Sequence, residues 1–143
     1  VCCLLLFCQL AIAAVMRHSF AGLAIPTFPY STADGGLLPV DWNFRVGIHF
    51  AHRTMAVVLT VALVWFAIKI WADRGASLLM RCGASLLVGL LAFQLLLGAW
   101  IIWSRHAVTM TTGHVLVGAA TLATAFSLTW LAHRDRIERP PTP

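Results

Sequence analysis

The sequence contains few charged residues. Asp, Glu, Lys and Arg make up only 10% of its 143 residues, against about 25% in an average soluble domain. Such a chain cannot surround a folded core with a water-compatible surface, so its composition excludes an ordinary soluble domain. The 10 basic and 5 acidic residues do not form a basic patch, because the cations flank apolar segments. We therefore expect no nucleic-acid partner.

The chain also lacks a recognisable cysteine pattern. The four cysteines are Cys2, Cys3, Cys8 and Cys82. They fall within apolar segments or at the end of one, and their spacing matches no zinc or iron–sulfur pattern. An oxidising compartment would favour disulfides in an exposed loop, so we interpret these thiols as small apolar residues of helices.

Apolar residues are abundant instead, at 60% of the chain with a mean hydropathy of +0.86. They form four stretches, which cover residues 1–15, 46–72, 82–103 and 109–132. The last three reach the ~20 residues that a helix needs to cross a bilayer. The first is shorter and begins with Val1, so we expect residue 1 to be the cut end of a longer helix. A signal peptide is the competing interpretation of this first stretch.

These stretches predict an all-α, integral membrane, antiparallel four-helix bundle over residues 1–134, with the lipid bilayer around it. Six basic residues lie around the 73–81 connection and after the last helix, and four lie on the opposite side. The positive-inside rule then places the C-terminus in the cytoplasm, and we expect a bacterial plasma membrane. The outer loop spans about 17–45, and residues 135–143 are expected to form a disordered cytoplasmic tail.

Two histidines occupy matched positions in separate apolar segments. His52 and His114 each follow the outer start of their segment by one to two turns, and both segments run from outside to inside. At 1.5 Å per residue their depths agree within a few ångströms. Ionisable groups inside a membrane are functional candidates, and two imidazoles at one depth suit the two axial positions of a six-coordinate haem iron.

Arginines near the outer face are candidates for pairing with the haem propionates. Arg53 adjoins His52, and Arg17 and Arg105 end the first and third apolar stretches on that side. The competing interpretation is that arginines at helix ends only reach toward lipid phosphates.

The remaining polar residues of the apolar stretches have several roles open to them. His49 shares a helix face with His52 and could form a pocket wall, a hydrogen-bond partner or an alternative ligand. His18 and His106 are expected at the membrane interface, and Gln9 and Gln94 in hydrogen bonds between helices. Gln9 is at the start of a run that ends in Arg17-His18. Gln94 is at the start of a similar run that ends in Arg105-His106. This similarity suggests that the chain contains two copies of one helical hairpin.

Two other interpretations of the histidine pair stay open. The two imidazoles could be unrelated polar groups, each satisfied by a neighbouring helix. A zinc or copper ion would need a third or fourth ligand nearby, and no thiolate or carboxylate lies at that level in the sequence.

Three segments together resemble the C-terminal four-helix half of the haem A synthase family, over about residues 9–133. They are MRHSFAGLAIPTFPYS, IHFAHRTMA and FQLLLGAWIIWSRHAVTMTTGHVLVGAATLA. The resemblance implies an eight-helix protein made of two similar halves, which oxidises the C8 methyl of haem O to the formyl group of haem A for terminal oxidases. It implies that this half holds a haem b between His52 and His114.

The sequence departs from the substrate-binding half of that family at three positions. His49 stands where that half has a glutamate implicated in catalysis, and Ile25 and Ser31 stand where many members have cysteines. The resemblance therefore implies that this chain lacks the substrate half, and that the missing N-terminal half or a second copy supplies it. Haem O synthase is a further partner that the resemblance suggests. The alternatives are a stand-alone b-type membrane cytochrome for electron transfer and a structural bundle without a cofactor.

Overall fold

The computed structural model describes residues 1–105 and 108–138, with side chains up to residue 134. It contains four helices, α1 (Cys2–His18), α2 (Phe44–Ala72), α3 (Leu78–Trp103) and α4 (Val108–Glu138). The predicted all-helical fold is confirmed. Helices α2, α3 and the 108–134 part of α4 are long and apolar enough to cross a membrane, whereas α1 has 17 residues. By helix composition the chain is a multi-pass membrane protein.

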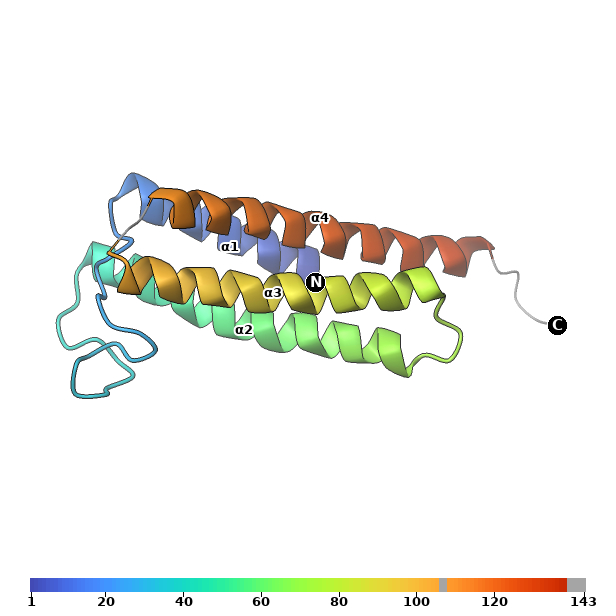
Figure 1. Ribbon diagram of the computed structural model, residues 1–143, viewed down its shortest axis with the longest axis horizontal. Helices are drawn as coiled ribbons and strands as arrows, with labels where there is room; N and C mark the ends of the chain where they lie inside the picture. Colours follow the sequence, from blue (N-terminus) through green and yellow to red (C-terminus); the bar gives the residue numbers. More distant parts are fainter. Residues whose placement is uncertain (106–107, 139–143) are drawn as a thin grey trace.

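The helices run up and down in sequence order (Figure 1). The α1–α2 loop and the α3–α4 connection lie at one end, and the α2–α3 turn lies at the other end (Figure 1). Each helix packs against its neighbours in the sequence, and α1 also packs against α4. Within the described residues, the backbones of α1 and α3 do not come close to each other, and neither do those of α2 and α4. The bundle is therefore a square in section, with α1 and α3 on one diagonal and α2 and α4 on the other.

Side-chain caps fix where two helices begin. The Asn43 side chain accepts a 3.0 Å hydrogen bond from the Val46 amide, and the Ser77 hydroxyl accepts one of 3.3 Å from the Met80 amide. These caps satisfy amide groups that have no partner within the helix. As a result α2 and α3 begin at Phe44 and Leu78, a few residues before the apolar stretches that predicted them.

The C-terminal end differs from the expected tail. Helix α4 continues to Glu138, so the backbone of residues 135–138 is helical, while residues 139–143 lie outside the described part. The sequence from 133 to 138 is polar apart from Ile137, and it contains no glycine or proline. Loss of hydrophobicity ends a membrane segment without ending a helix, because Arg and Glu are good helix formers.

The inner half of the bundle has an apolar core. Its fully buried members include Leu63, Ala67, Ala84, Leu87 and Ala125. Large apolar side chains also cover the outside of every helix, among them Phe7, Trp65, Phe93 and Trp130. A water-exposed surface would not carry so many apolar groups, and this distribution matches a lipid-facing exterior.

The two helices that end at the outer face stop in the same way. After α1, the amide of Ser19 bonds to the Val15 carbonyl and Phe20 adopts φ 54°. After α3, the amide of Ser104 bonds to the Trp100 carbonyl and Arg105 adopts φ 52°. A left-handed residue after the last turn is a frequent way to end a helix.

These matching ends define an internal repeat. Gln9 precedes the cap residue Ser19 by the same number of residues as Gln94 precedes Ser104. The helical hairpin expected twice in the sequence is therefore present, and its register is set by Ser19 and Ser104. In that register Arg17 corresponds to Ile102 rather than to Arg105, which corrects the alignment expected from the Arg-His pairs.

Candidate functional site

The imidazole rings of His52 and His114 meet inside the bundle. Their centroids are 6.4 Å apart and their planes are inclined at 60°. The two residues come from α2 and α4, which lie on a diagonal and whose backbones do not come close to each other, so the rings meet in the space that all four helices surround. The structure thus brings together the two histidines singled out in the sequence.

Both rings carry a nitrogen without a hydrogen-bond partner. Nδ1 of His52 and Nδ1 of His114 are buried, and neither has a partner among the described residues. A buried polar atom left unpaired costs about 1–3 kcal/mol. Two such atoms in one place indicate either strain or a site for a group that the protein binds.

Glutamines from the other diagonal complete this polar layer. Gln9 of α1 donates from Nε2 to the backbone carbonyl of His52 at 3.0 Å, and the same nitrogen lies 3.5 Å from Nε2 of His52. On the opposite side, the His114 ring lies against the backbone of Gln94 in α3. Each of the four helices therefore contributes one polar side chain at this level. The sequence placed both glutamines between helices but gave no reason to connect them with the histidines, apart from the weak internal repeat.

In the second hairpin, two glycines make room for the side chains of His114 and Gln94. A Cβ on Gly98 of α3 would lie 3.4 Å from Cε1 of His114, and a Cβ on Gly118 of α4 would lie 3.1 Å from Nε2 of Gln94. Each polar side chain thus fills a notch that a glycine leaves on the facing helix. Such close approach is typical of small residues in membrane helix packing.

The outer loop is fastened to α2 by Arg53. Its Nη2 donates to the carbonyls of Ile25 at 3.0 Å and Thr27 at 2.6 Å, and its Nη1 donates to that of Tyr30 at 3.3 Å. The guanidinium also stacks over Phe28, 5.7 Å from the ring centroid. The three hydrogen bonds to the loop use three of the five N–H donors of the guanidinium. The structure thus uses Arg53 to close the loop over the bundle, a role that the sequence did not predict.

His49 belongs to the same anchor. The residue is 3% exposed; its Nδ1 accepts from the Ile25 amide at 3.2 Å, and its Nε2 lies 3.2 Å from Nε of Arg53. A neutral imidazole has only one acceptor nitrogen, so these two contacts compete for it. Of the roles left open by the sequence, the structure gives His49 that of a hydrogen-bond partner that ties the loop to α2.

Arg17 and Arg105, the other two propionate candidates, are not bound to the loop in the way that Arg53 is. Both are exposed at the outer end of the bundle, and neither guanidinium has a hydrogen-bond partner among the residues that the structure describes. His18 is also exposed at this end, whereas His106 lies outside the described residues. Together with the exposed Arg45 at the start of α2, Arg17 and Arg105 make three outer-face arginines without a hydrogen-bond partner among the described residues.

The histidine pair can be tested against the geometry that a metal would need. A metal–imidazole bond is about 2 Å long and the ring centre lies about 1 Å farther, so imidazoles on opposite sides of one ion have centroids about 6 Å apart. The observed 6.4 Å fits this requirement. Among the described residues, no three His, Cys, Asp or Glu side chains converge. The pair therefore suits an ion that brings its other ligands with it, as haem iron does.

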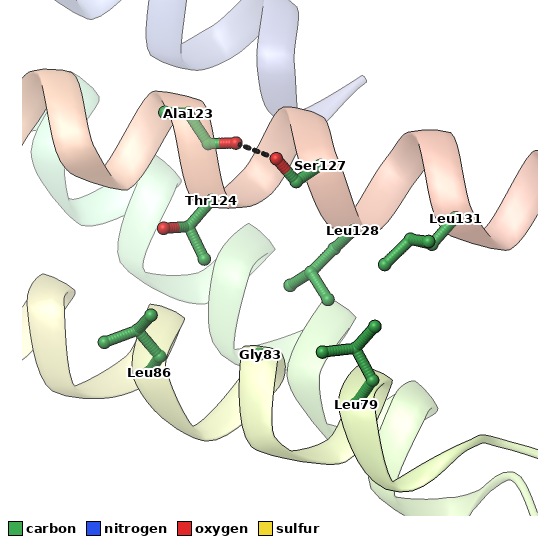
Figure 2. Close-up of a pocket in the computed structure, with 8 residues that line it drawn as sticks. All are labelled: Leu79, Gly83, Leu86, Ala123, Thr124, Ser127, Leu128 and Leu131. Carbon is green, nitrogen blue, oxygen red and sulfur yellow. Dashed lines mark hydrogen bonds between the residues drawn. The ribbon is translucent and has the colours of Figure 1, made fainter.

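A surface hollow between α3 and α4 has no comparable chemistry. It lies toward the inner half of these helices, and its lining is apolar except for the hydroxyls of Thr124 and Ser127 (Figure 2). Ser127 donates to the carbonyl of Ala123, and Thr124 donates to that of Ala120. With both hydroxyls satisfied within their own helix, the hollow is a lipid-facing groove and not a reaction site.

Comparison with known proteins identifies the family. Residues 1–126 match the family described as cytochrome oxidase assembly protein, COX15-CtaA. A heme A synthase from Sphingopyxis alaskensis is 32% identical to the chain over 143 residues, which cover 93% of this chain and 39% of that protein. No solved structure gives a significant match. The chain, which spans about two fifths of the length of this relative, belongs to the COX15-CtaA family of cytochrome oxidase assembly proteins.

Proposed function

We propose that this chain is the haem-b-binding half of a haem A synthase, the membrane enzyme that oxidises the C8 methyl of haem O to the formyl of haem A. The observation that carries the proposal is the pair His52 and His114, whose ring centroids lie 6.4 Å apart inside the bundle and which each have one unpaired nitrogen. Family membership and the similarity to a heme A synthase support the same conclusion.

Residues at the outer end of the bundle would bind different parts of the haem. His52 and His114 would ligate the iron, and Arg17 and Arg105 would face the propionates because their guanidinium groups are uncommitted. Arg53 was the first candidate for the propionates in the sequence, but its hydrogen bonds to Ile25, Thr27 and Tyr30 make it an anchor of the loop. His52 and His114 would hold the haem b, which would supply one-electron transfer there.

The oxidation of haem O belongs, in this proposal, to a second four-helix unit. His49 occupies the position of the family's catalytic glutamate, and it accepts a hydrogen bond from the Ile25 amide inside the loop anchor. Because His49 is 3% exposed and bonded within the loop anchor, we do not assign it the role of the glutamate. We propose that an N-terminal half of the same protein, or a second copy, provides the substrate site, and that haem O synthase delivers the substrate.

The distribution of positive charges supports a membrane orientation. The outer loop, Arg17 and Arg105 lie at one end of the bundle, while Lys69, Arg74 and Arg81 lie at the end with the α2–α3 turn. We propose a multi-pass protein of a bacterial plasma membrane with the C-terminus in the cytoplasm.

Haem composition of cells tests this function. In a strain without the gene, we expect haem A to be lost and haem O to accumulate, as measured by chromatography of extracted pigments. The wild-type gene should restore haem A, His52→Ala should not, and His18→Ala should serve as the matched control that does. Normal haem A in the deletion strain, together with haem b in the purified chain, would show a stand-alone b-type cytochrome instead.

A further inference from the structure

The last part of the outer loop, residues 37–44, exposes all of its large apolar side chains. Their exposed fractions range from 57% to 80%, and they are Leu37, Leu38, Val40, Trp42 and Phe44. Pro39 is buried between two of them, so the segment is attached to the protein at its centre while the side chains around Pro39 stay exposed. A cluster of this kind marks a surface that meets another protein or a membrane. We call residues 37–44 the apolar segment.

A closed turn holds the chain just before the apolar segment. The Ser31 amide donates to the Gly36 carbonyl at 2.8 Å, and the Gly36 amide donates to Oγ1 of Thr32 at 2.7 Å. The Ser31 hydroxyl also donates to the carbonyl of Leu37, the first residue of the segment, at 2.8 Å. The exposure of the apolar segment is therefore a property of a folded loop.

The apolar segment lies beside α2 and not beyond its end. The Trp42 ring packs edge-on against the Phe50 ring, with centroids 5.3 Å apart and planes inclined at 78°. Phe50 follows Phe44, the first residue of α2, by six residues, which is about 9 Å along the helix axis. Figure 1 shows the loop extending sideways past the outer end of α2 instead of continuing along the long axis of the bundle. The segment is therefore at the level of the first turns of a membrane helix.

The apolar segment continues the lipid-facing exterior of α2. Val57 and Val61 follow Phe50 by two and three helical turns and therefore lie on the same face of the helix. Both valines are exposed and belong to the apolar exterior of the bundle. Trp42, which packs on Phe50, thus extends this face toward the outer end. Aromatic residues are enriched where membrane proteins cross the headgroup level.

The order of residue types favours lipid over a protein partner. Residues 40–45 alternate strictly between apolar and polar, and all of them are exposed. A dry protein interface would bury the charges of Asp41 and Arg45, which costs free energy unless each is paired. The boundary between lipid headgroups and acyl chains accommodates both kinds of side chain, because apolar groups enter the chains while charged groups stay among the headgroups.

We propose that the apolar segment is a membrane-docking surface, which inserts beside α2 into the headgroup–acyl boundary of the leaflet at the outer end of the bundle. The outer loop is then held from two sides, by the hydrogen bonds of Arg53 and by lipid. This surface does not depend on haem binding.

Photochemical labelling in membranes identifies what covers the apolar segment. Leu38 is replaced by a diazirine analogue of leucine in the whole protein as it lies in cell membranes, and Val40 is replaced in the same way as a second site. Irradiation joins the analogue to whatever it touches, and mass spectrometry of the purified protein identifies the adduct. Val61 of α2 is the lipid-facing control, and Asp34, which is exposed in the closed turn, is the polar control.

We expect phospholipid adducts at both sites, at a yield comparable to that at Val61 and several-fold above that at Asp34. Water adducts at Leu38 and Val40 would overturn the proposal, because the segment would then face solvent. Adducts to another polypeptide segment would overturn it as well, and would show that a second four-helix unit covers the loop. Both results would leave the proposed haem site intact, whereas loss of that site would not change the labelling.

Discussion

Nη2 of Arg53, in the second helix, donates a 2.6 Å hydrogen bond to the carbonyl oxygen of Thr27 in the outer loop. The same side chain reaches Ile25 and Tyr30, so one residue closes the loop over the end of the bundle where the histidine pair lies. The loop is therefore a structured cover of the candidate haem site and not a passive connection.

Substitution of Arg53 by Lys should release this loop. A lysine keeps the charge but lacks the planar fork that reaches three carbonyls, and each lost hydrogen bond to a charged donor is worth about 1.5–3 kcal/mol. Proteolysis that follows local opening should then become at least about tenfold faster in the loop. Limited proteolysis near the exposed Leu37 and Leu38 measures this effect. Arg45→Lys, at an exposed position of α2, is the control, and equal cleavage of both variants would refute the anchoring role.

Arg17 and Arg105 should contribute to haem retention. Arg17→Gln and Arg105→Gln each remove an exposed charge from the outer face, and exposed ion pairs are typically worth about 0.2–1 kcal/mol. We expect haem transfer to a soluble apoglobin to become about 2- to 5-fold faster for each variant, and the difference from wild type to shrink at high salt. Arg74→Gln, at the opposite end of the bundle, should have no effect. If Arg74→Gln accelerates transfer as much, the arginines do not face the propionates.

Glycines of α3 should differ sharply in their tolerance of alanine. A Cβ on Gly83 would lie 2.6 Å from Cδ2 of Leu128, a side chain that is only 2% exposed and cannot move aside without disturbing the core. Overpacking of this kind lowers the free energy of unfolding by about 1–3 kcal/mol. A Cβ on Gly89 would have no other atom within 4 Å, so Gly89→Ala should be neutral or slightly stabilising. Unfolding in mixed micelles of increasing sodium dodecyl sulfate compares the two, and equal stability would contradict the packing of α3 against α4.

The helices and the histidine pair could be predicted from the sequence, because both depend on patterns along a single helix. Apolar length predicted α2, α3 and α4, and the matched depths of His52 and His114 predicted that they would meet. The helix ends were less accurate, because Asn43 and Ser77 set them through capping and not through hydrophobicity.

The roles of Arg53, Gln9 and Gln94 could not be derived in the same way. These roles depend on how the outer loop folds back over the bundle and on which helices lie diagonally opposite each other. Neither property produces a recognisable pattern along the sequence. Arg53 and Arg17 look alike in the sequence, since each adjoins a histidine near the outer face. Only the structure separates the arginine that holds the loop from the one whose charge is available.

The absorption spectrum of the purified chain tests the central claim most directly, since axial ligands determine the spin state of haem iron. With haem b supplied, the wild-type chain and His18→Ala should show a low-spin spectrum, and His52→Ala and His114→Ala should each lose it. A low-spin spectrum that survives unchanged in either alanine variant would contradict the claim that the second and fourth helices hold one haem between these two rings.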